Sequence, residues 1–230
     1  MTNPSPDSII DALSIDCLIF GFKNGRLDIL LIKHGEGISE GRWALPGGWI
    51  TYGESVDEAA NRLLKSLTGI NNIYMEQLKA FGEPNRYPTK RVVTIAYYAL
   101  VNEENYSLIP GFTASDAQWF NIHEVPDLPY DHNSILKYGF QQLKHYVRHE
   151  PVGFNLLPQK FTLLQLQELY EAILETRLDK SNFRRKLAKM KLLKKSDEKQ
   201  KDVSHRAAEL YQFDKRVYVT LKRNGIDFEL

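Results

Sequence analysis

Apolar and polar residues alternate along the first two thirds of the chain in a way that predicts strands interleaved with two helices. Strands are predicted by β-rich, mostly apolar runs at 14–22, 27–34, 74–81, 91–101 and 116–122. A turn with Asn24-Gly25 at its centre joins the first two runs. Apolar residues at helical spacing predict a helix that starts after Ser55 and runs through Leu67, and a second helix at 132–147. This order predicts an α/β fold in which a mixed sheet lies between helices.

The pattern changes near residue 150. Thr162 and Gln165 have the spacing of a capping box, and the helix that they begin is predicted to continue through Leu174. After a short turn, a second helix is predicted at 180–191, with inward-facing Phe183, Leu187 and Met190. Strand-like pieces follow at 192–196 and 206–213, with a third at 217–221. Two helices joined by a tight turn and followed by strands are typical of a winged helix-turn-helix. We therefore expect two domains, 1–150 and 151–230.

Composition places the chain among ordinary globular proteins, with 43% hydrophobic and 26% charged residues. The sequence contains no apolar run long enough to span a bilayer, and no basic segment followed by an apolar core at its start. The expected location is the cytoplasm, with no membrane partner. The single cysteine, Cys17, lies in an apolar run and is expected to be a buried hydrophobe.

The overall charge of +1 conceals an asymmetry between the two halves. Residues 151–230 contain 17 Lys and Arg against 11 Asp and Glu, whereas residues 1–150 contain 13 against 18. A basic second half that is also predicted to be a winged helix suggests a double-stranded DNA partner. Candidate DNA contacts are Lys180, Asn182, Arg184, Arg185 and Lys189 on the second helix, with His205 and Arg206 at the wing.

One stretch, 48–70, carries a specific motif. Its fixed positions are Gly48, Glu54, Arg62, Leu64, Gly69 and Ile70. This frame resembles a Nudix box, in which a glycine, five residues, a glutamate and seven residues precede Arg-Glu-apolar-any-Glu-Glu-any-Gly-apolar. The resemblance implies the Nudix fold, an α/β/α sandwich, for the first domain.

The three glutamates at the core of that motif are replaced by Leu63, Ser66 and Leu67. Nudix hydrolysis needs carboxylates on one helix face to hold divalent cations, which polarise the diphosphate and generate the attacking water. We therefore expect no catalytic residue, no metal site and no cofactor, and we interpret Glu54 as a helix-terminus residue. A scaffold without its catalyst suggests a sensor.

Candidate ligand-binding residues in the first domain are Trp43, Gly48, Arg86, Arg91, Asp131 and His132. Arg86 and Arg91 lie in the segment 81–92, which resembles the loop after the box in ADP-ribose-type Nudix proteins, but two aspartates of that loop are Asn85 and Tyr87 here. Each candidate has an ordinary alternative. The arginines are equally suited to surface positions or carboxylate pairing, Trp43 to a core position, and Asp131 to capping the following helix.

Nearly the whole chain, from about residue 12 to about 221, resembles the Nudix-related transcriptional regulators. It is similar more narrowly to their arabinose-responsive branch, through the segments 15–22, 72–77, 95–100 and 150–158. The resemblance implies a homodimeric repressor that binds a pseudo-palindromic operator and is released by L-arabinose. Two alternatives stay open: a regulator of the same build that senses ADP-ribose or another NAD metabolite, and an active Nudix pyrophosphatase with an atypical metal site.

Overall fold

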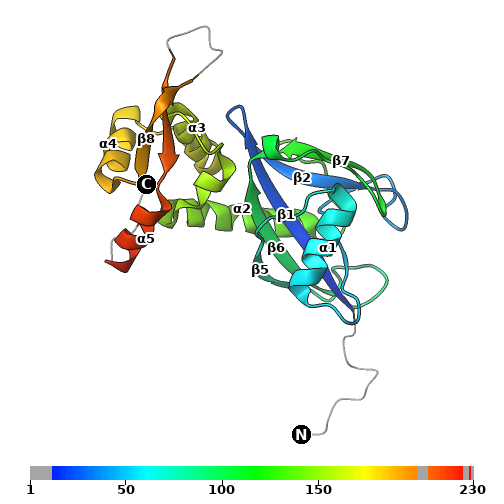
Figure 1. Cartoon of the computed structure of the whole chain (residues 1–230). Helices are drawn as coiled ribbons and strands as arrows, with labels where there is room; N and C mark the ends of the chain where they lie inside the picture. Colours follow the sequence, from blue (N-terminus) through cyan, green and yellow to red (C-terminus); the bar gives the residue numbers. More distant parts are fainter. Residues whose placement is uncertain (1–11, 201–206, 225–227, 229–230) are drawn as a thin grey trace, which may run out of the picture. The chain divides into compact units, whose positions relative to one another are not determined.

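The computed structural model describes residues 12–200, 207–224 and 228, and divides the chain into two compact units (Figure 1). The first unit contains the residues up to Phe20 together with Asp28–Ala99 and Tyr106–Gly139. The second contains Gly21–Leu27, Leu100–Asn105 and the chain from Phe140 onward.

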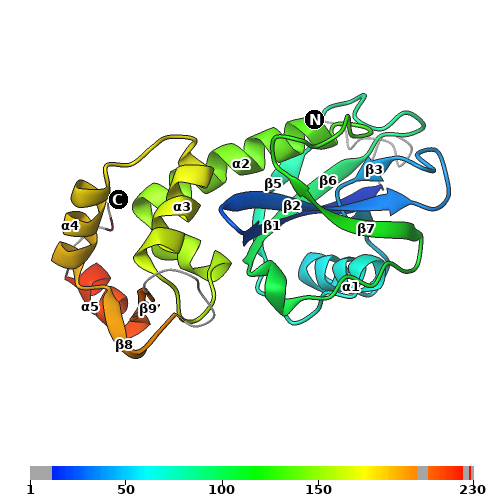
Figure 2. The same cartoon turned by 90° about the horizontal axis from the view of Figure 1, so that it is seen from above.

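The first unit is built on a twisted sheet. Its strands β3 (Trp43–Ala44), β2 (Arg26–His34), β1 (Leu13–Lys23), β6 (Val93–Val101) and β5 (Glu76–Phe81) lie side by side in that order. In addition, β4 (Gly47–Trp49) pairs antiparallel with β1, and β7 (Ala114–Asn121) pairs antiparallel with β2. Helix α1 (Val56–Thr68) covers one face of the sheet, and the first part of α2 (His132–His149) covers the other (Figure 2). This is the predicted α/β/α sandwich.

Helix α1 is defined at both ends by local sequence. Ser55 accepts a hydrogen bond from the backbone N–H of Glu58, whose carboxylate accepts one from the N–H of Ser55, so the expected capping box is confirmed. Gly69 ends the helix with φ of 78°, a left-handed conformation that glycine adopts without strain. The face towards the sheet is buried and consists of Ala59, Ala60, Leu63, Leu64 and Leu67.

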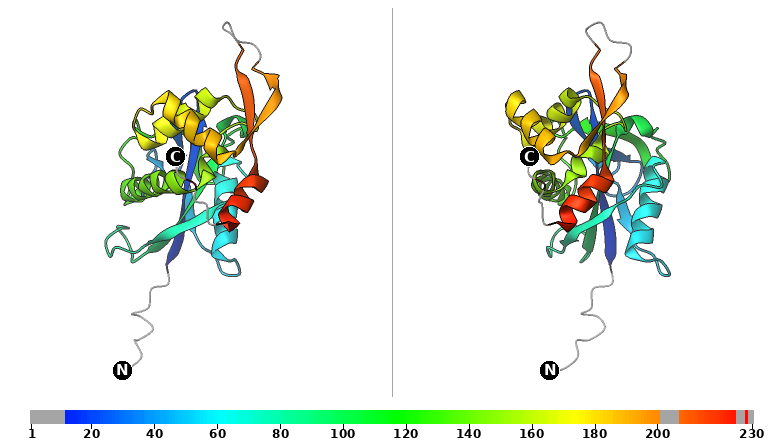
Figure 3. Two further views of the ribbon diagram at one scale, coloured as in Figure 1. Left: turned by 90° about the vertical axis from the view of Figure 1, so that its left-hand side faces the viewer. Right: turned by 60° about the vertical axis from the view of Figure 1, so that its left-hand side comes forward.

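The second unit has the predicted winged-helix order. Helix α3 (Leu163–Leu174) begins at the Thr162 capping box, and α4 (Lys180–Met190) begins at Asp179. Strands β8 (Leu193–Lys199) and β9 (Glu209–Phe213) then form a two-stranded antiparallel ribbon that extends past both helices (Figure 3). The core of the unit is aromatic. Rings of Phe154 and Phe213 stack at 4.4 Å, those of Tyr170 and Phe183 lie 5.9 Å apart, and the short helix η3 (Pro151–Leu156) contributes Phe154.

The strand predicted at 217–221 is wrong, because Lys215–Arg223 form helix α5. Asp214 caps it by accepting hydrogen bonds from the N–H groups of Arg216 and Val217. The β-branched residues misled the prediction, although Val217, Tyr218 and Leu221 also have helical spacing. Strand β8 also runs to Lys199, into a segment that was expected to be a loop.

Two smaller expectations can be compared directly with the structure. Cys17 is fully buried, and burial raises the pKa of its thiol well above its ordinary value. In the part of the chain that the structure describes, no helix is both long and apolar enough to cross a membrane.

Removing the hydroxyl that begins α3 tests the winged-helix unit. Thr162→Ala deletes the acceptor for the N–H of Gln165, so we expect the free energy of unfolding to fall by about 1 kcal/mol. Thr162→Ser retains an acceptor and serves as the matched control. Urea denaturation measures both variants. If both variants lose the same free energy of unfolding, the loss comes from the missing methyl group of Thr162 and the cap contributes nothing.

Candidate functional site

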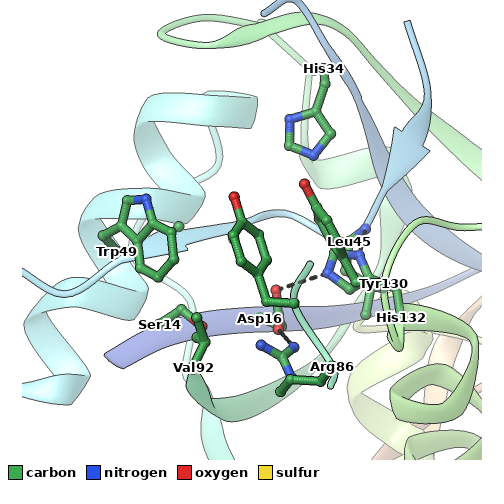
Figure 4. A pocket seen from close by; sticks show the side chains of 12 residues that line it. Ser14, Asp16, His34, Leu45, Trp49, Arg86, Val92, Tyr130 and His132 are labelled. Atoms are coloured by element: carbon green, nitrogen blue, oxygen red, sulfur yellow. Dashed lines mark hydrogen bonds and ion pairs between the residues drawn. The ribbon is translucent and has the colours of Figure 1, made fainter. Parts of the chain in front are cut away.

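A pocket of about 120 Å³ opens in the first unit, where β1 and β4 meet the loop before β6 and the start of α2 (Figure 4). It is lined by Ser14, Asp16, His34, Leu45, Gly47, Gly48, Trp49, Arg86, Tyr87, Val92, Tyr130 and His132. These residues come from segments far apart in sequence, so the fold has to assemble the pocket.

The floor of the pocket is an ion-pair network centred on Arg86. One nitrogen of its guanidinium, Nη2, lies 3.1 Å from Asp16 and 2.7 Å from Asp131, and Nε lies 2.9 Å from the other oxygen of Asp131. The side chains of Arg86 and Asp16 are only 3% and 7% exposed. Buried charges persist when they are paired and hydrogen-bonded, and all three groups meet that condition here.

His132 holds Asp16 from the other side. The backbone N–H of Leu45 donates to Nδ1 of His132 at 3.1 Å, so this nitrogen carries a lone pair and the ring hydrogen resides on Nε2. Nε2 lies 3.3 Å from an oxygen of Asp16. The geometry therefore selects the neutral tautomer that points its N–H at the carboxylate.

These contacts set the charge of the pocket. Burial opposes ionisation of Asp16, but His132 and Arg86 outweigh it and hold the pKa of Asp16 below its ordinary value. Burial of the His34 ring lowers its pKa from its ordinary value, and the nearby carboxylate of Asp16 only partly opposes this shift. Asp16 and Asp131 both pair with Arg86, so two carboxylates face one guanidinium and the floor has an excess of one acidic group.

Aromatic rings form the wall opposite this floor. Tyr87 lies between Trp49, at 5.6 Å edge-on, and Tyr130, at 4.9 Å. Tyr130 adopts a left-handed backbone conformation, with φ of 58°, and its hydroxyl accepts a hydrogen bond from Ser39 at 2.8 Å. At the edge of the wall, the ammonium of Lys90 sits 4.1 Å from the centre of the Trp49 ring.

The structure brings together some of the predicted ligand-binding residues and separates others. Gly48, Arg86 and His132 line the pocket, and Asp131 supports it by pairing with Arg86 through its carboxylate. Trp43 is not among the lining residues and packs edge-on against Phe120 at 4.8 Å. Arg91 is also outside the lining, and it donates to the carbonyls of Gly82 and Glu83.

Sequence reasoning missed the pocket residues Asp16, Trp49, Tyr87 and Tyr130. One signal was available, because Asp16 is a carboxylate inside an otherwise apolar predicted strand, and a buried charge there requires a partner. The aromatic residues gave no such signal, since rings in loops pack in many ways.

The positions of the missing glutamates on α1 now serve packing. Leu63 and Leu67 are 2% and 1% exposed, and a Cβ on Gly48 would lie only 2.7 Å from a methyl group of Leu63. The hydroxyl of Ser66 donates to the carbonyl of Leu63 at 3.1 Å. Among the residues described, no group of three or more His, Cys, Asp or Glu side chains is arranged to hold a metal ion.

Glu54 precedes α1 and stabilises the start of this helix through hydrogen bonds. Its carboxylate accepts hydrogen bonds from Arg62 and from the backbone and side chain of Thr51, which lower its pKa to about 2. Arg62 donates in addition to the carbonyl of Trp49 at 3.0 Å. The pair thus ties α1 to the strand β4 that lines the pocket.

Helix α4 presents the predicted DNA-binding side chains to solvent. Phe183 and Leu187 are buried, whereas Lys180, Asn182, Arg184, Arg185 and Lys189 are exposed. Asn182 accepts a hydrogen bond from Arg185 at 2.8 Å, which orders both side chains on the exposed face. His205 and Arg206 lie outside the described residues.

Known families match both halves of the chain. Residues 11–142 match the NUDIX domain, and residues 153–213 match the NrtR DNA-binding winged helix domain. The chain is 32% identical over 214 residues to the ADPR responsive transcriptional repressor NtrR of Acinetobacter baylyi, an alignment that covers 91% of this chain and 83% of the relative.

Solved structures agree with this match. NrtR of Shewanella oneidensis in complex with a 27mer DNA is similar, with a TM-score of 0.74, 26% identity, and coverage of 90% of this chain and 95% of that chain. The NUDIX domain of the same protein complexed with ADP ribose is similar with a TM-score of 0.55 and 26% identity, covering 61% of this chain and 94% of that chain.

These relatives correct one expectation. The regulator among them is named for its response to ADP-ribose, so the narrower resemblance to the arabinose-responsive branch is not supported. The broader assignment rests on a family match over more than half of the chain and on a relative aligned over nearly its whole length. The chain belongs to the NrtR-type transcriptional regulators, in which a Nudix domain is followed by a winged-helix DNA-binding domain.

Proposed function

We propose that this protein is a transcriptional repressor that is released from its operator when ADP-ribose or a related NAD metabolite binds the Nudix pocket. The observation that carries the proposal is a pocket with a buried polar floor, in a Nudix unit whose metal-binding positions hold Leu63, Ser66 and Leu67. Such a site is equipped for recognition and lacks the carboxylates of the catalyst. ADP-ribose replaces L-arabinose as the proposed effector because it is the ligand of the similar regulators.

The pocket volume constrains how such a ligand binds. At about 120 Å³ it is smaller than the roughly 300–1,000 Å³ of sites that enclose a drug-sized ligand. ADP-ribose contains two ribose rings, an adenine and a diphosphate, so most of it lies beyond the enclosed volume. Ligand binding therefore engages the pocket with one part of the molecule.

DNA binding is proposed for the exposed face of α4 and for the wing. Lys180 and Lys189 supply phosphate attraction, and Asn182, Arg184 and Arg185 face the major groove. His205 and Arg206 are proposed wing contacts. A homodimer on a pseudo-palindromic operator is the arrangement that matches two recognition helices to two half-sites.

Repression and release require a free-energy coupling between the two domains. ADP-ribose must bind the state that does not bind DNA better than the operator-binding state, by an amount equal to the coupling free energy. A change in the spacing of the two recognition helices of the dimer would provide that difference.

The proposed recognition helix predicts a specific loss of DNA affinity. Arg184→Ala combined with Arg185→Ala should raise the operator Kd at least tenfold, because each arginine supplies base or phosphate contacts. Lys189→Ala should weaken binding to all sequences and reduce the salt slope by about one. Lys65→Ala, an exposed lysine on α1, is the control. Fluorescence anisotropy measures each Kd, and equal effects from Lys65→Ala would contradict the assignment.

Effector control is tested by the same anisotropy assay. Saturating ADP-ribose should raise the operator Kd by a factor of about 5 to 150, the usual range for coupled sites. Arg86→Met should abolish this response by removing the centre of the polar floor, provided that circular dichroism shows a folded protein. An operator Kd that does not change at saturating ADP-ribose would refute the proposal.

The absence of catalysis is the third expectation. With Mg²⁺ or Mn²⁺ present, we expect no hydrolysis of ADP-ribose to AMP and ribose 5-phosphate, because buried leucines cannot bind a hard cation. Chromatography of the products measures this. Metal-dependent turnover would instead support the pyrophosphatase alternative.

A further inference from the structure

We infer that the enclosed pocket binds an uncharged, hydroxyl-bearing sugar ring of the effector, and that the effector's phosphates stay outside it, beside Lys90. This inference deepens the proposed function and rests on it. It identifies which end of a nucleotide-sugar ligand enters the pocket and which residue contacts the anionic part.

The charge of the floor excludes phosphate from the interior. Asp16 and Asp131 both pair with the guanidinium of Arg86, whose single positive charge offsets only one of the two carboxylates. The hydrogen bond from the backbone of Leu45 keeps His132 in its neutral form. A phosphate placed there would lie next to a net negative charge inside a buried site, where repulsion is strong because water screens it little. A neutral ring meets no such repulsion.

The hydrogen-bonding capacity left on the floor suits hydroxyl groups. An ionised carboxylate offers about four acceptor sites; Arg86 and His132 each occupy one on Asp16, and the buried hydroxyl of Thr94 also lies against this carboxylate, which leaves at least one site. Arg86 uses Nε and both hydrogens of Nη2, and no bond from Nη1 to another described residue is found. A spare acceptor beside a spare donor complements adjacent sugar hydroxyls, because each hydroxyl both donates and accepts.

Size and shape agree with a single ring. The volume of about 120 Å³ is small for a ligand site, and the side opposite the floor is formed by Trp49, Tyr87 and Tyr130. Aromatic faces pack against the C–H groups of a sugar while its hydroxyls point to the floor. Figure 4 shows Trp49 and Tyr130 on this wall, with Asp16 and Arg86 below them.

A cation at the edge of the aromatic wall gives the phosphates a place outside the pocket. Lys90 is exposed, lies over Trp49, and makes no ion pair with another described residue. By contrast, Arg62 pairs with Glu54, and Arg91 donates to two carbonyls. Lys90 is therefore the cation available to a phosphate group just outside the pocket.

Calorimetric titration of the full chain tests this arrangement with three probes: ADP-ribose, ribose and inorganic pyrophosphate. Lys90→Ala should weaken ADP-ribose binding at least fivefold and reduce its dependence on salt, while ribose binding stays unchanged. Lys90→Glu should weaken ADP-ribose further. Pyrophosphate should not compete with ribose. Lys90 is exposed, so both variants are expected to fold, and Lys65→Ala is again the control.

The outcomes separate this inference from the proposed function. If ADP-ribose binds but Lys90→Ala leaves its affinity and salt dependence unchanged, or pyrophosphate displaces ribose, the inference is overturned and the proposed effector stands. If only uncharged sugars such as ribose or L-arabinose bind, the proposed effector is wrong and so is the phosphate position at Lys90. Selective loss of ADP-ribose affinity in Lys90→Ala supports both.

Discussion

The buried ion pair between Asp16 and Arg86 is the interaction on which the candidate site depends. It joins the centre of β1 to the loop before β6, and through Asp131 it joins both to the start of α2. An unpaired charge at either position would be strongly destabilising, so the three segments are held together. The same pairing, with the neutral tautomer of His132, gives the pocket its negative interior and its free acceptor and donor sites.

Around this site the chain keeps the Nudix scaffold while using the catalytic helix for packing. The ion pair between Glu54 and Arg62 holds the start of α1 in place. Leu63 and Leu67 are buried on the face of α1 where the Nudix motif has glutamates. Glutamates at these two positions would bury uncompensated charge, so the core of this unit is built without them. The winged-helix unit has its own aromatic core, and its basic recognition face stays exposed.

Much of this was predictable from sequence because it depends on local signals. Both capping boxes, the longer strands of the sheet and the helix-turn-helix follow from residue spacing, whereas the short strands β3 and β4 were not predicted. Helix α5 was not predicted, since β-branched residues there favour a strand, although the cap at Asp214 and the helical spacing of the apolar residues favour a helix. The pocket was half predictable: Arg86 and His132 stand in recognisable segments, whereas Tyr87 and Tyr130 become neighbours only through the fold. Effector identity also escaped: the sequence resemblance pointed to the arabinose-responsive branch, whereas the similar regulator is named for its response to ADP-ribose.

The most direct test of the central claim, that the Nudix unit is a sensor for a nucleotide sugar, is the melting temperature of the full chain measured against ligand concentration. A ligand that binds the native state selectively raises the melting temperature progressively as its concentration increases. The account predicts such a rise with ADP-ribose and none with L-arabinose at equal concentration. A rise with L-arabinose and none with ADP-ribose would contradict it.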